Sequence, residues 1–190
     1  VVLGADTTGA GNLNVNAYGA PVVLTANNGN VEISGDIIAT DSALTRGIQI
    51  VSNDIGIGGD VDVANLGSVV FGDSGTVGLV TSKLDIDGAL MANNNGGVEI
   101  YSYGTNVGSM SGDGKVVAHG AYIIAEAGNI DIGGNVLFDG TTANTGLIIE
   151  DTDSFKLGTT VAGSDVSLGA VSIGAGRTFE IESADAVLVG

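Results

Sequence analysis

A short motif of alternating apolar and polar residues, bounded by glycine, recurs along this chain. Its clearest copy is Gly128-Asn129-Ile130-Asp131-Ile132-Gly133-Gly134, and shorter copies begin at Gly11, Gly29 and Gly96. Alternation over five residues is the pattern of a β-strand that buries one face. A strand this short cannot bury that face alone, so the copies are expected to stack on one another, as in a repeat protein.

The spacing of the turn glycines suggests the length of one repeat. An interval of 18 residues separates them within three blocks, and residues 51–95 are the least regular stretch; the blocks are Gly11, Gly29 and Gly47, then Gly96 and Gly114, then Gly128 and Gly146, with Ser164 at the next step. We therefore predict a single domain over residues 1–190, a parallel β-solenoid with coils of about 18 residues. About ten coils spaced by about 4.8 Å would make a rod about 50 Å long.

Composition supports an all-β fold and leaves a second architecture open. The chain has 33 glycines, one proline and only 4% aromatic residues. No long stretch places apolar residues at the spacing of a helix face. The alternative is an antiparallel β-sandwich, a fibre subunit completed by strand donation, but sandwiches usually carry an aromatic core. The aliphatic composition favours the solenoid.

Alternation along each strand assigns side chains to the two faces of the sheet. The apolar positions of the motif copies should point inward: Leu13, Val15, Val31, Ile33, Val98, Ile100, Val116, Ile130, Ile132, Val166, Leu168, Phe179 and Ile181. The polar positions should point outward: Asn14, Glu32, Glu99, Asp131, Ser167 and Glu180.

Charge and cysteine content limit the classes of partner. The chain has 22 acidic residues against five basic ones, a net charge of −17, and no cysteine. Too few basic residues exist to form a patch that binds nucleic acid or an anionic membrane. No apolar run is long enough to span a membrane as a helix. The chain begins at Val1 without Met or a basic leader, so we expect a secreted protein whose signal peptide has been removed.

The motif copies at 29–35 and 128–134 resemble the degenerate repeats of filamentous-haemagglutinin-type adhesins and of the passenger domains of autotransporters. Those bacterial surface proteins are right-handed parallel β-helices that form fibres and adhesins. The resemblance implies a right-handed solenoid at the cell surface. It transfers no functional residue, because the repeats hold structural positions only.

Candidate catalytic and metal-binding groups are few. His119, the only histidine, lies in Val-Ala-His-Gly without a nucleophile motif and is expected to be an exposed turn residue. Paired carboxylates at Asp60/Asp62, Asp85/Asp87 and Glu180/Glu182 leave a polysaccharide-cleaving enzyme as an alternative, although the basic and aromatic residues of a sugar groove are scarce. Calcium suits hard oxygen ligands. The weak candidates for a calcium site, as in a surface-layer protein, are Asp85, Asp87, Glu150, Asp151 and Asp153.

Two further features point to contacts with other molecules. Tyr101 and Tyr103 are expected to share an outward face, where they could stack on glycans or contact a protein. The apolar ends of the chain lack a capping element, so an open coil would expose unpaired backbone groups there. We expect these ends to mediate assembly: Val1, Val2 and Leu3 at one end and Val187, Leu188 and Val189 at the other. Together these features predict a non-enzymatic, extracellular structural protein that forms the shaft of a surface fibre or adhesin and self-assembles end to end.

Overall fold

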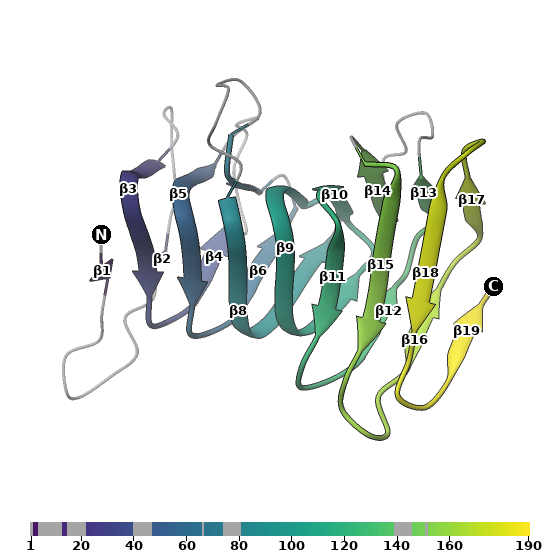
Figure 1. Cartoon of the computed structure of the whole chain (residues 1–190). Helices are drawn as coiled ribbons and strands as arrows, with labels where there is room; N and C mark the ends of the chain where they lie inside the picture. Colours follow the sequence, from purple (N-terminus) through teal and green to yellow (C-terminus); the bar gives the residue numbers. More distant parts are fainter. Residues whose placement is uncertain are drawn as a thin grey trace.

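A computed structural model of the chain describes residues 2–3, 13–14, 22–39, 47–65, 67–73, 81–138, 146–150 and 152–190. All the regular secondary structure in this part of the chain is β-strand, as predicted (Figure 1). The described residues contain no helix that is long and apolar enough to cross a membrane. The strands are β1 (Val2–Leu3), β2 (Leu13–Asn14), β3 (Val22–Ile33), β4 (Ile37–Ala39), β5 (Ile48–Ile57), β6 (Val61–Ala64), β7 (Ser68–Phe71), β8 (Thr81–Asn93), β9 (Gly97–Gly112), β10 (Lys115–His119), β11 (Tyr122–Ala125), β12 (Ile130–Ile132), β13 (Val136–Phe138), β14 (Gly146–Glu150), β15 (Ser154–Thr159), β16 (Val166–Leu168), β17 (Val171–Ile173), β18 (Thr178–Glu182) and β19 (Val187–Val189).

These strands pair in parallel, and their pairings form three ladders. The first ladder joins β3, β5, β7, β9, β10, β14, β13 and β17 in that order. The second joins β1, β3, β5, β8, β9, β11, β15 and β18. The third joins β2, β4, β6, β8, β9, β12, β16 and β19. Long strands such as β9 belong to more than one ladder because they continue round a corner.

With one exception in the first ladder, the chain visits the three ladders in turn and adds one strand beside the last at each visit. We call one such set of strands a layer; β10, β11 and β12 form one, and β17, β18 and β19 form the last. The first and last layers lie at opposite ends of the molecule (Figure 1). Because the described strands all pair in parallel, the antiparallel sandwich alternative is wrong.

The predicted 18-residue repeat holds for only one step between layers. Gly97 pairs with Lys115, 18 residues later, but Ile130 pairs with Val166, 36 residues later. The glycines that suggested a constant period occupy different places in a layer: Gly29 lies within β3, whereas Gly146 begins β14. Because the connections differ in length, the number of residues per layer varies. The described part of the chain contributes eight strands to the second ladder, where about ten coils were predicted.

The first ladder departs from chain order at one place. Strand β13 precedes β14 in the chain, yet β14 lies between β10 and β13. Ile148 of β14 thus has Val117 and Leu137 as its neighbours and is fully buried, although it lies outside the main core cluster.

Stacked aliphatic side chains from all three ladders make one continuous core. In the third ladder, for example, Ile37, Val61, Leu90, Met110, Ile130 and Val166 follow one another in register, and each is at most 1% exposed. Phe71, Phe138 and Phe155 are the largest buried side chains. Burial of this kind is the main favourable term in folding, because apolar area leaves water.

The predicted faces agree with the structure where it describes them. Val31, Ile33, Val98, Ile100, Val116, Ile130, Ile132, Val166 and Leu168 are buried, and Phe179 and Ile181 are partly buried against the core. Glu32, Asp131 and Glu180 are exposed, while Glu99 and Ser167 are half-buried. The side chains of Leu13 and Asn14, and the whole of Val15, lie outside the described residues.

Candidate functional site

A column of Asp and Asn side chains lies at the corner between the second and third ladders. The column consists of Asp36, Asp60, Asn129 and Asp165, each one residue before a strand of the third ladder. Asp36 Oδ1 accepts a hydrogen bond from the backbone N–H of Asp60 (2.9 Å), and Asp60 Oδ1 accepts one from the N–H of Ala89 (2.7 Å). Each side chain thus holds the backbone of the next layer.

The same arrangement recurs near the other end of the molecule. Asn129 Oδ1 accepts a hydrogen bond from the N–H of Asp165, and Asp165 Oδ1 accepts one from the N–H of Ala186, both at 3.0 Å. Because an amide and a carboxylate do the same work in this column, its function is to accept hydrogen bonds from backbone N–H groups at the turn. Sequence reasoning missed this column, although a signal is present: each member follows Gly or Ser and directly precedes Ile or Val.

Two of the calcium candidates lie on the outer face of the second ladder. Asp85 accepts a hydrogen bond from Lys83 Nζ at 2.7 Å, and this bond raises the pKa of Lys83 above its usual value. Asp87 is exposed, and it lines an open hollow of about 330 Å³ together with Glu32, Gly56 and Asp85. An ammonium group therefore already neutralises the Asp85 carboxylate.

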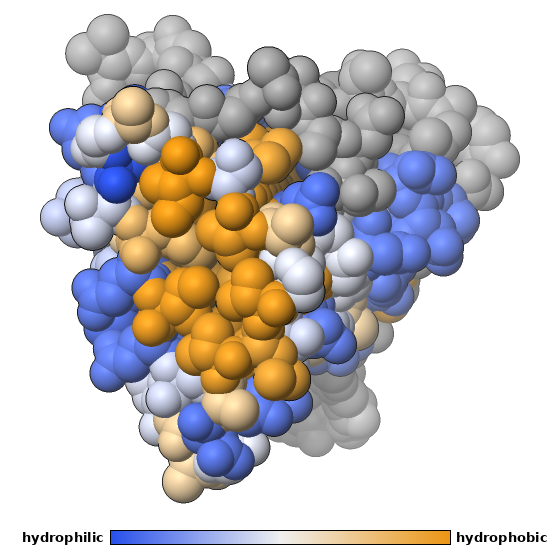
Figure 2. Space-filling model, turned by 90° about the vertical axis from the view of Figure 1, so that its right-hand side faces the viewer, coloured by the Kyte–Doolittle hydropathy of each residue, from blue (hydrophilic) through white to orange (hydrophobic). Residues whose placement is uncertain are grey.

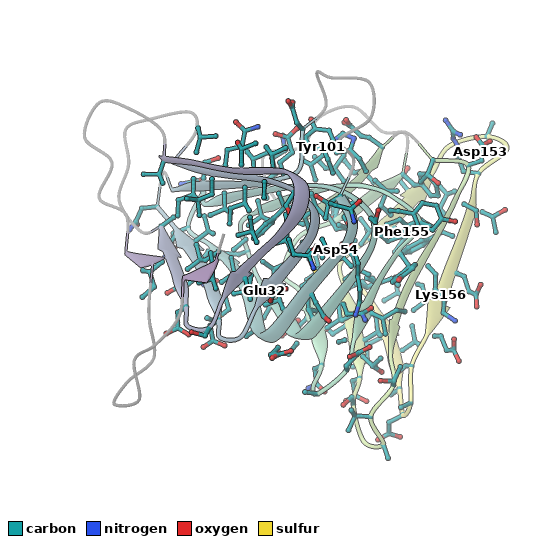
Figure 3. The ribbon with its side chains drawn as sticks, turned by 60° about the vertical axis from the view of Figure 1, so that its left-hand side comes forward. Glu32, Asp54, Tyr101, Asp153, Phe155 and Lys156 are labelled. Carbon is teal, nitrogen blue, oxygen red and sulfur yellow. The ribbon has the colours of Figure 1, made fainter. Side chains whose placement is uncertain are left out.

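The other calcium candidates are separated from these. Glu150 pairs in register with His119 in the first ladder. Asp153, which Figure 3 labels, forms an ion pair with Arg177. Asp151 lies outside the described residues. Among the described residues, no three His, Cys, Asp or Glu side chains are grouped closely enough to hold a metal ion.

Tyr101, His119 and Glu99 come together on the outer face of the first ladder. The rings of Tyr101 and His119 stack with centroids 4.1 Å apart and planes 13° from parallel. Tyr101 Oη donates a hydrogen bond of 2.5 Å to Glu99 Oε1, which lies 3.7 Å from His119 Nε2. The His119 side chain is only 10% exposed at the end of β10, so the predicted exposed turn histidine is wrong. Sequence alone could not place it, because the stack depends on the pairing of β9 with β10.

Tyr103 is separated from this group, because β9 passes from the first ladder to the second between the two tyrosines. Ser102 is buried at the corner, where its Oγ donates a hydrogen bond to Gly104 O. Tyr103 is 69% exposed, whereas Tyr101 is half-buried against His119. The two rings therefore differ in ladder and in exposure, and their contact with another molecule stays a prediction.

A second open hollow lies on the second ladder near the C-terminal end. It measures about 480 Å³, and Tyr122, Ile124, Lys156, Gly158 and Glu182 contribute to its lining. Lys156 Nζ contacts the carboxylates of Glu182 and Glu180, and these contacts raise its pKa, with the hydrogen bond to Glu182 as the larger cause. Its side chain points outward while the neighbouring Phe155 points into the core (Figure 3). Glu180 and Glu182 thus form an exposed ion pair with Lys156.

Comparison with known proteins supplies no further assignment. No family model, no curated protein and no solved structure matches this chain.

Proposed function

We propose that this chain is a parallel β-helix, or β-solenoid, that forms part of the stiff shaft of an extracellular fibre. The observation that carries the proposal is the set of three parallel ladders that run from one end of the molecule to the other. A chain built in this way resists bending, because backbone hydrogen bonds run along the long axis in all three ladders and a single packed core lies between them. The right-handed sense of the solenoid remains a prediction from the resemblance to bacterial surface adhesins.

The exterior suits such a role. Its acidic side chains give a net charge of −17, which keeps an aliphatic rod soluble and opposes lateral aggregation. The corner column uses Asp and Asn to fix one layer on the next, so part of the acidic content supports the shaft directly. Calcium, glycans and a polysaccharide-cleaving activity remain predictions from the sequence, without a geometry in the described part of the chain that favours them.

Immunogold electron microscopy on cells that produce the protein tests this proposal. Antibodies raised against the purified chain should decorate filaments that extend from the surface of intact cells. An antibody against a cytoplasmic protein, applied to the same cells, should give no label. Label that appears only after the cells are opened would refute an extracellular shaft.

A further inference from the structure

The last layer of the structure leaves core positions uncovered. Val187 continues the third-ladder row whose earlier members are at most 1% exposed, yet it is 44% exposed. Val189 is 53% exposed beside Leu168 at 4%, and Ile173 is 47% exposed beside Phe138 at 1%. Figure 2 shows the result, a broad hydrophobic surface at this end of the molecule with hydrophilic residues around it. A further layer would bury these side chains as each earlier layer is buried.

The backbone at this end is also open. Among the described strands, β17 pairs only with β13, β18 only with β15 and β19 only with β16. Gly190 N–H donates to Leu168 O, and Ala186 O accepts from Val166 N–H. Since alternate residues of a strand direct their backbone groups to the same side, the N–H and C=O groups of Val187 and Val189 face away from β16. Such an edge is a template for another parallel strand.

The first layer presents the matching edges in the same three ladders. Within the described part of the chain, β1 pairs only with β3, β2 only with β4, and the start of β3 only with β5. Pairing places Leu3 beside buried Ile33, Leu13 beside buried Ile37, and Leu24 beside buried Ile50. The backbone register therefore continues three buried rows to this end, where Leu24 is half-buried.

We propose that the first layer of a second copy of this chain docks on the last layer of the first, and that all three ladders continue across the junction. The inference rests on the proposed shaft function and names its partner. A single strand from an unrelated protein could cover only one edge. Three edges at fixed separations require three strands with the same spacing, and β1, β2 and the start of β3 stack on the same three ladders.

A junction of this kind joins two different surfaces, so it does not close on itself and produces a filament. Each copy would add eight layers of about 4.8 Å, an axial repeat of about 38 Å.

Charge substitutions at the last strand test the junction, and the chain supplies a matched control. Val189→Asp places a carboxylate at a core position that faces the second copy. Leu188→Asp changes a neighbouring side chain that is equally exposed, at 57%, but points outward in register with Ser167. The expected result is that the wild-type chain and Leu188→Asp form filaments with a repeat of about 38 Å, whereas Val189→Asp stays monomeric in analytical ultracentrifugation. Circular dichroism and thermal unfolding confirm that both variants fold.

Mixing two blocked variants tests the direction of the contact. Leu24→Asp blocks the first layer but leaves the last layer intact, while Val189→Asp does the reverse. Each variant alone should remain a monomer, and an equimolar mixture should stop at a dimer.

Wild-type chain that stays monomeric at high concentration would overturn the proposal, as would equal assembly by Val189→Asp and Leu188→Asp. Surface label on cells together with a monomeric purified chain would leave the shaft function standing and remove only the second copy as its partner.

Discussion

Replacing Asp60 with alanine removes one acceptor from the corner column that joins successive layers. Asp60 Oδ1 accepts a hydrogen bond from the backbone N–H of Ala89 at 2.7 Å. A hydrogen bond to a charged group contributes about 1.5 to 3 kcal/mol. Because Asp60 is exposed and water can partly replace its carboxylate, we expect the free energy of unfolding to fall by about 1 to 2 kcal/mol.

Asp62 provides the matched control. It lies two residues away in β6, with its half-buried side chain on the outer face, and the described contacts give it no hydrogen bond. Asp62→Ala should change the free energy of unfolding by less than about 0.5 kcal/mol. Asp60→Asn should retain most of the stability, because the amide oxygen of Asn129 fills the same position in the column.

Urea denaturation followed by circular dichroism measures these free energies. The variants should share one slope of free energy against urea concentration, so that shifts in midpoint report stability. Equal losses for Asp60→Ala and Asp62→Ala would refute the stabilising role of Asp60 in the corner column. A loss for Asp60→Asn as large as that for Asp60→Ala would show that charge, and not the hydrogen-bond acceptor, is what stabilises the corner.

Three further predictions concern the core, the glycines and calcium. Phe71→Ala should lower the free energy of unfolding by about 3 to 5 kcal/mol, because the side chain is fully buried, and Phe179→Ala should cost clearly less; comparable losses would contradict the described burial. Gly112→Ala should destabilise the chain, because φ is +135° and a Cβ would lie 1.9 Å from Ala92 O, whereas Gly29→Ala meets nothing within 4 Å; thermal unfolding should separate the two variants. Calcium should raise the melting temperature no more than sodium chloride at equal ionic strength, since the described acidic groups provide charge to be screened and no metal cluster; saturable, stoichiometric binding in calorimetry would contradict this.

Local alternation predicted which side chains form the core, because each short strand has a period of two whatever its partner. Ile130 and Ile132 are buried and Asp131 is exposed, as the pattern indicated. The repeat length could not be obtained in the same way. Glycine serves several kinds of corner and strand position, so equal spacing between glycines such as Gly29 and Gly47 does not mean equal position in a layer.

Contacts between layers depend on register, which no single motif encodes. Tyr101 meets His119 because β10 pairs with β9 at an 18-residue offset, whereas Glu150 reaches the same row from 31 residues further on. The role of Asp60 was also hidden, because the sequence showed it only as one of a pair of carboxylates with Asp62. Only the neighbouring layer shows that its oxygen accepts a backbone N–H.

Distances between spin labels on one row of the second ladder test the central claim, that the chain is a stack of parallel layers, most directly. Glu32, Asp85 and Glu182 share one row in register. Asp85 lies two layer steps from Glu32, and Glu182 lies four further steps from Asp85. The chain has no cysteine, so labels can be attached at Glu32→Cys, Asp85→Cys and Glu182→Cys in pairs. Double electron–electron resonance should give narrow distance distributions at about 29 Å for Glu32 with Glu182 and at about 19 Å for Asp85 with Glu182, because each layer step adds about 4.8 Å. Broad distributions, or equal distances for the two pairs, would contradict the stack.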